Sequence, residues 1–145
     1  MKSKEGNLYI LLISVHGLIR GHDLELGRDA DTGGQTKYVV ELARALGEQP
    51  DVAKVDLVTR RINDENVSQD YSEHTESLSE NVNIIRIDCA DQLYIAKEQL
   101  WDYLDNFSDN LLEYLHSNDL TPHIIHSHKS LLWRYSSKLS EKLSR

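Results

Sequence analysis

The chain has 145 residues, a formal net charge of −8 and one cysteine, Cys89. A chain of this length forms one domain with a sizeable hydrophobic core. The acidic balance argues against binding to nucleic acid or to an anionic membrane surface, because both need a basic face. A single cysteine excludes an intrachain disulfide, so a reducing, cytoplasmic compartment is the simplest expectation. The first apolar run, residues 8–15, is too short to cross a bilayer and carries no signal-peptide pattern.

The hydrophobic pattern predicts four strands and two helices in the order βαββαβ. Residues 1–7 are polar and are expected to form a flexible N-terminus. Strands are expected at residues 8–15, 54–59, 82–88 and 123–126, and helices at residues 35–46 and from residue 97 onward. The polar, acidic stretch at residues 62–81 is interpreted as a flexible, solvated excursion. Strands separated by helices favour an α/β fold with a mainly parallel sheet.

Two adjacent glycines, Gly33 and Gly34, stand where a long loop at residues 16–32 meets the first predicted helix. At such a junction, free N–H groups and the positive end of the helix dipole face whatever binds above the sheet. Glycines also let a phosphate come close to the backbone. A turn that binds nothing explains this spacing equally well. The pair alone is therefore a weak signal.

Several other polar residues follow predicted strands. Arg60 and Arg61 come after the second strand, at the edge where open α/β sheets bind ligands, but salt bridges to the acidic stretch explain them equally well. His16 and His128 end the first and fourth strands and either line a cleft or satisfy a turn. His126 and His128 share one strand face, yet zinc needs a third and usually a fourth ligand, so no metal is expected. The catalytic residues stay unassigned, since no nucleophile motif is evident.

Residues 15–46, centred on Asp-Thr-Gly-Gly-Gln at residues 31–35, closely resemble the opening of sucrose-phosphate synthases. Those enzymes are retaining glycosyltransferases of the GT-B fold. They move glucose from UDP-glucose to fructose 6-phosphate and give sucrose 6-phosphate. The resemblance runs from about residue 8 to residue 128. It implies that residues 8–145 form a partial Rossmann-like, acceptor-side N-terminal domain, with a mainly parallel sheet and flanking helices.

The same resemblance implies a substrate-binding set. The backbone around Gly33, Gly34 and Gln35 would meet the donor diphosphate and the acceptor sugar phosphate, and the Gln35 side chain would hydrogen-bond a sugar hydroxyl. Lys97 matches a family lysine that contacts the acceptor phosphate, although an exposed helix lysine is the ordinary interpretation. No cofactor is implied. The residues that stabilise the leaving diphosphate and grip the ribose belong to the family's second domain.

The resemblance stops at residue 128, where the family continues with an aromatic residue and a glycine-containing turn that this chain lacks. We therefore expect a truncated or frameshifted product of a longer synthase gene, inactive alone because catalysis needs both walls of the cleft. An open sheet edge would remain, and we expect marginal stability or self-association through it.

Two alternatives stay open. One is a non-catalytic module that binds a sugar phosphate or a protein through the same face. The other is a sucrose synthase that uses free fructose, since sucrose synthases share the Asp-Thr-Gly-Gly-Gln motif. Lys97 and the Lys-Tyr-Val-Val-Glu-Leu-Ala-Arg pattern at residues 37–44 favour the sucrose-phosphate synthases over the sucrose synthases.

Overall fold

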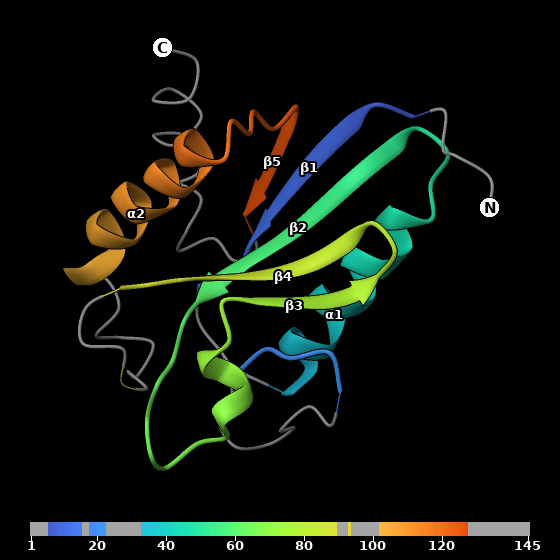
Figure 1. The fold of residues 1–145 in the computed structure, drawn as a ribbon. Helices are drawn as coiled ribbons and strands as arrows, with labels where there is room; N and C mark the ends of the chain where they lie inside the picture. Colours follow the sequence, from blue (N-terminus) through green and yellow to red (C-terminus); the bar gives the residue numbers. More distant parts are fainter. Residues whose placement is uncertain (1–5, 16–17, 23–32, 90–92, 94–101, 128–145) are drawn as a thin grey trace.

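The computed structural model describes residues 6–15, 18–22, 33–89, 93 and 102–127. In this part of the chain one sheet has the strand order β3-β4-β2-β1-β5 (Figure 1). The elements are β1 (Leu8–Ile13), α1 (Gly33–Gly47), β2 (Val52–Arg60), the 3-10 helix η1 (Gln69–Ser72), β3 (Thr75–Ser79), β4 (Val82–Ile87), α2 (Leu104–Ser117) and β5 (Ile124–Ser127). All strand pairs are parallel except β3 with β4. The predicted mainly parallel α/β sheet is confirmed.

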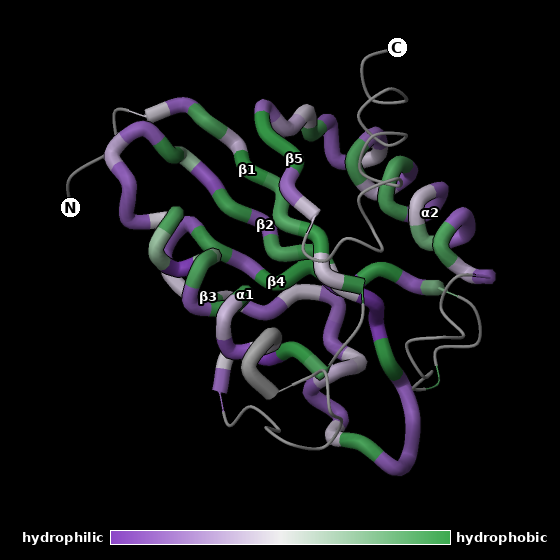
Figure 2. The backbone as a smooth tube through the Cα atoms, turned by 180° about the vertical axis from the view of Figure 1, so that it is seen from behind, coloured by the Kyte–Doolittle hydropathy of each residue, from purple (hydrophilic) through white to green (hydrophobic). Residues whose placement is uncertain are grey.

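Strand β1 lies between β2 and β5 and is buried on both faces. Its side chains alternate: Tyr9, Leu11 and Ile13 join a core cluster with α2, whereas Ile10 and Leu12 join a second cluster with α1. A strand covered by helices on both faces has apolar residues at successive positions, which explains the unbroken apolar run in the sequence. Figure 2 shows the same hydrophobic band through β1, β2 and β4.

Helix α1 packs on one face of the sheet through Val39, Val40 and Ala43, which are at most 2% exposed. It begins at Gly33, two residues before the predicted start, and ends at Gly47. A Cβ atom added to Gly47 would lie 2.3 Å from Val82 Cγ2. Glycine is therefore required there because the end of the helix touches β4.

Helix α2 covers the opposite face of the sheet. Its buried stripe contains Leu104, Phe107, Leu111 and Leu115, which recur at helical spacing. The helix begins at Leu104. The N-terminal part of the predicted helix, residues 97–101, lies outside the described residues.

The expectation of a flexible excursion at residues 62–81 is corrected by the structure. This stretch contains η1 and β3, and β3 pairs with β4 so that Glu76 lies opposite Ile84. Tyr71 of η1 is 1% exposed and packs with Leu18 and Ile62 in a third, smaller cluster. The polar, acidic composition of this stretch did not indicate a strand. Strand β3 lies at the edge of the sheet, and its residues alternate between exposed and partly buried.

The connections determine where a ligand can reach the sheet. Because β1 and β2 are parallel neighbours joined through α1, the helix runs antiparallel to them and its N-terminus lies at their carboxyl ends. The chain moves outward from β1 to β2 and β4, then returns to place β5 on the other side of β1. The topological switch point, where open α/β sheets bind ligands, is therefore between β1 and β5.

Candidate functional site

The carboxyl ends of β1 and β5 form the switch point, with Ile13 paired to Ser127. Ser14 follows β1 and is 1% exposed, and its N–H donates to Val58 O at 2.9 Å. His16 and His128 follow these strands in the sequence, but both lie outside the described residues. Their predicted placement at a cleft therefore stays a prediction.

Gly33, Gly34 and Gln35 form the first turn of α1. The first four N–H groups of any helix have no acceptor within that helix, and the helix dipole places partial positive charge there. The backbone of this turn lies on the ligand side of the sheet, where the sequence predicts an anion. The described part of the chain does not include the side chain of Gln35 or any part of Lys97. Whether these four residues bind substrate stays a prediction.

The structure places both arginines, Arg60 and Arg61, at the carboxyl end of β2. Arg60 is 3% exposed. Arg61 donates from Nε to Ser72 O at 2.7 Å and from Nη1 to Asp88 Oδ1 at 3.0 Å. The alternative explanation by a salt bridge thus holds for Arg61, but its carboxylate comes from the end of β4 rather than from the acidic stretch.

The loop after β1, residues 18–22, is held by the segment that sequence reasoning took for a flexible excursion. Arg20 pairs through Nη1 with Asp70 Oδ2 at 3.2 Å, and its guanidinium lies 5.2 Å from the centre of the Tyr71 ring. Arg20 Nε also donates to His22 O at 2.9 Å, and His22 Nε2 lies 3.5 Å from Asp70 Oδ2. The acidic side chain of η1 therefore has a structural use: it fixes this loop.

A buried ion pair holds the same loop more firmly. Arg86 of β4, 2% exposed, donates from Nη2 to Ile19 O at 2.7 Å and to Glu76 Oε1 at 2.8 Å. It also donates from Nη1 to Glu73 O at 3.1 Å. The other oxygen of Glu76, Oε2, accepts from Gly21 N–H at 2.7 Å. Sequence reasoning missed this pair, whose only signal was a charged residue inside the apolar run of β4.

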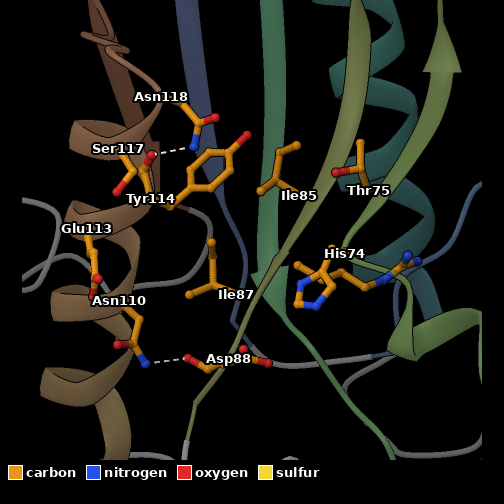
Figure 3. A pocket seen from close by; sticks show the side chains of 11 residues that line it. His74, Thr75, Ile85, Ile87, Asp88, Asn110, Glu113, Tyr114, Ser117 and Asn118 are labelled. Carbon is orange, nitrogen blue, oxygen red and sulfur yellow. Dashed lines mark hydrogen bonds between the residues drawn. The ribbon is translucent and has the colours of Figure 1, made fainter.

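A pocket of about 340 Å³ lies elsewhere, between α2 and the β3–β4 edge (Figure 3). Ile85 and Ile87 of β4 contribute apolar side chains, and Glu113 of α2 and Asp88 contribute carboxylates. Asn110 Nδ2 donates to Asp88 O at 2.7 Å. None of the predicted site residues lines this pocket. Arg86 also lines the pocket, but its guanidinium is already paired with Glu76, and the carboxylates of Asp88 and Glu113 repel a phosphate.

A buried carboxylate lies under α2, in the middle of β2. Asp56 is 0% exposed, and its Oδ2 accepts from Tyr9 Oη at 2.6 Å and lies 3.6 Å from Lys54 Nζ. Within the described residues, Asp56 Oδ1 has no hydrogen-bond partner. Burial raises the pKa of Asp56 above its ordinary value, although the Tyr9 hydroxyl and the Lys54 ammonium oppose this shift. Burial, followed by the hydrogen bond to Asp56, also raises the pKa of Tyr9.

Replacing Asp56 with asparagine is expected to change how stability depends on pH. With a raised pKa, the native state holds the Asp56 proton more tightly than the unfolded chain does. This contribution to stability is present below the unfolded pKa, about 3.9, and is lost as pH rises through the folded pKa. Asp56→Asn should therefore gain stability relative to the wild type between pH 4 and pH 7, measured by urea unfolding at each pH. A relative loss over that range would mean that Lys54 and Tyr9 outweigh burial.

Among the described residues, no group of three or more His, Cys, Asp or Glu side chains is placed to hold a metal ion. None of the helices described has the length and apolar character needed to cross a membrane.

The fold defines the class of this protein. Helices cover both faces of a mainly parallel sheet, and the glycine-containing start of α1 lies at the carboxyl ends of the strands. This arrangement is a Rossmann-like α/β unit.

Comparison with known proteins narrows the class. The sucrose-phosphate synthase of Zea mays is 43% identical over 151 residues, covering 87% of this chain and 14% of that protein. That of Spinacia oleracea is 50% identical over 127 residues, covering 77% of this chain and 12% of that protein. The solved structure of sucrose-phosphate synthase from Thermosynechococcus elongatus superposes with a TM-score of 0.68 at 27% identity, covering 95% of this chain and 30% of the solved one. None of the protein-family models compared with the chain matches it.

The chain belongs to the family of sucrose-phosphate synthases, which are glycosyltransferases. The resemblance noted in residues 8–128 is thereby confirmed. The chain spans about one seventh of the length of the curated relatives, since it covers 12–14% of those quoted.

Proposed function

We propose that this chain forms part of the acceptor side of a sucrose-phosphate synthase, which transfers glucose from UDP-glucose to fructose 6-phosphate and gives sucrose 6-phosphate. In this proposal the backbone of Gly33 and Gly34 and the side chains of Gln35 and Lys97 contact the substrates. The observation that carries it is the identity of 43–50% with sucrose-phosphate synthases, over a stretch that includes the start of α1.

Physical chemistry supports an anionic ligand at this place despite the net charge of −8. The amides at the start of α1 are aimed beyond the carboxyl ends of the strands, and the dipole of a helix of 15 residues favours negative charge there. Lys97 would add a point charge for the acceptor phosphate. A bare hexose lacks that phosphate, so it gains no charge attraction from either feature.

The proposal predicts that the chain binds fructose 6-phosphate more tightly than fructose. Lys97→Gln should weaken fructose 6-phosphate binding by about 10- to 100-fold, because a hydrogen bond to a charged group contributes about 1.5–3 kcal/mol. Binding of fructose should not change. Isothermal titration calorimetry, or chemical-shift titration where affinity is weak, measures both ligands.

Lys37→Gln is the matched control. It removes the same charge from an exposed lysine of α1 whose Nζ lies 4.0 Å from Glu41 Oε1. Equal affinity for fructose and fructose 6-phosphate would favour a sucrose synthase that uses free fructose, and would contradict the proposal. Absence of binding to either sugar would favour a non-catalytic module that binds a protein through the same face.

Turnover is a separate part of the proposal. Transfer needs the groups that neutralise the leaving diphosphate, and by the family resemblance these belong to the second domain. The chain alone should therefore form no sucrose 6-phosphate. Detection of that product with the purified chain would contradict this part, whereas activity restored by a separately produced second domain would support it.

A further inference from the structure

We propose that Glu76 and Arg86 are positioning residues for the ligand site, a role that deepens the proposed function and rests on it. They hold the loop of residues 18–22, which lies in the sequence between β1 and the glycines of α1. Glu76 accepts from Gly21 N–H and from Arg86 Nη2, at 2.7 and 2.8 Å, and Arg86 Nη2 donates to Ile19 O at 2.7 Å. One buried ion pair thus holds two backbone groups of the loop.

The Gly21 peptide is held from two directions. Its N–H meets Glu76 of β3, and its carbonyl accepts from Arg44 Nη2 of α1 at 3.0 Å. A Cβ atom on Gly21 would lie 2.7 Å from Glu76 Oε2 and 2.7 Å from Leu78 Cδ2, so the loop approaches β3 as closely as glycine allows. The loop is therefore fixed to the edge strand and to α1 together.

A fixed loop favours binding because a ligand does not have to order it. Restricting the backbone costs conformational entropy, so a loop that is released samples many conformations. When only a fraction of molecules has the binding-competent arrangement, the apparent dissociation constant rises by the inverse of that fraction. In the sequence this loop lies between residues 16–17 and 31–35, which belong to the stretch that resembles the family. Loss of the ion pair should thus lower affinity without removing any group that touches the ligand.

The test compares Glu76→Gln with Asp88→Asn. Glutamine keeps the shape of Glu76 but has one acceptor oxygen, so either Gly21 N–H or Arg86 loses its partner. Asp88→Asn changes net charge by the same amount in the ion pair with Arg61, which joins the ends of β4 and β2. We expect Glu76→Gln to speed amide hydrogen exchange at Ile19 and Gly21 at least tenfold and to weaken fructose 6-phosphate binding about tenfold, with Asp88→Asn close to wild type in both.

A second variant separates position from charge. Gly21→Ala keeps Glu76 and Arg86 but displaces the loop through the two 2.7 Å contacts. It should reproduce the loss of affinity. Tyr9→Phe removes a buried hydrogen bond to Asp56 on the face of the sheet that α2 covers, opposite α1. It should lower stability while leaving affinity unchanged at a temperature where the variant is folded.

The outcomes distinguish the two proposals. If hydrogen exchange at Ile19 and Gly21 is unchanged in Glu76→Gln, the positioning role is wrong whether or not any ligand binds. If exchange rises but affinity stays at the wild-type value, the role in binding is likewise wrong. If the wild-type chain binds neither fructose 6-phosphate nor inorganic phosphate, the proposed function fails and the positioning role in binding fails with it, while faster exchange would still establish that the pair fixes the loop.

Discussion

Replacing Arg86 with methionine is expected to lower the free energy of unfolding by about 3–5 kcal/mol, because removing one partner of a buried ion pair leaves the other uncompensated. The side chain of Arg86 is 1% exposed and that of Glu76 is 21% exposed. Water therefore solvates the remaining carboxylate only weakly. The carbonyl groups of Ile19 and Glu73 lose a donor as well. Urea unfolding followed by circular dichroism measures the change.

Arg61→Met provides the control with the same substitution at a neighbouring strand end. Arg61 is 19% exposed and also donates to Ser72 O, but its partner Asp88 is 49% exposed, so the carboxylate left behind stays hydrated and the loss should be smaller. Arg86→Lys should fall between the two, because one ammonium group keeps the charge but does not reach three acceptors with the geometry of a guanidinium. A loss in Arg86→Met no larger than in Arg61→Met would show that the buried pair does not hold the fold together.

Hydrophobic pattern was sufficient to predict the parallel strands and both helices. The apolar residues of β1 form an unbroken run because the strand is buried on both faces. Those of α2 recur at helical spacing because only one face of the helix is buried. Boundaries were less exact. Helix α1 starts at Gly33 although glycine is a poor helix former, because the glycine-rich start lies at a helix end where propensity weighs least.

Strand β3 was missed because its stability does not come from apolar residues. Leu78 is the sole apolar residue of β3. Glu76 is directed inward because its carboxylate pairs with the guanidinium of Arg86 of β4. Pairing between residues ten apart in sequence leaves no local pattern. For the same reason the sequence did not predict that Asp56 is buried. Its hydrogen-bond partner, Tyr9, belongs to a different strand.

The candidate site likewise has a part that the sequence predicted and a part that it did not. The Asp-Thr-Gly-Gly-Gln motif located the start of α1 at the ligand side of the sheet, because a glycine pair at a strand-to-helix junction has a local meaning. The contacts that Asp70, Glu76 and Arg86 make with the loop of residues 18–22 join distant segments, and sequence reasoning assigned two of these residues to a solvated excursion. A motif indicates where a ligand is expected, but it does not indicate which distant side chains fix the backbone beside it.

Replacing Leu111 with alanine is expected to cost about 2–5 kcal/mol of unfolding free energy, the range for a leucine removed from a core that cannot collapse around the cavity. Leu111 is 0% exposed and lies in the cluster that joins α2 to β1, β2 and β4. The neighbouring strand residues are fixed by the sheet, so they have little freedom to fill the space. The same urea titration by circular dichroism gives the value.

Leu112→Ala tests whether this cost reflects burial or the loss of a leucine from the helix. Both substitutions remove the same atoms from adjacent positions of α2, and alanine raises helix propensity equally in both. Leu112 is only partly buried at the margin of the same cluster, so its loss should be well below that of Leu111. Equal losses would mean that α2 does not press one specific stripe against the sheet. The three-layer arrangement, on which the placement of α1 and the ligand edge depends, would then lack the support of this helix.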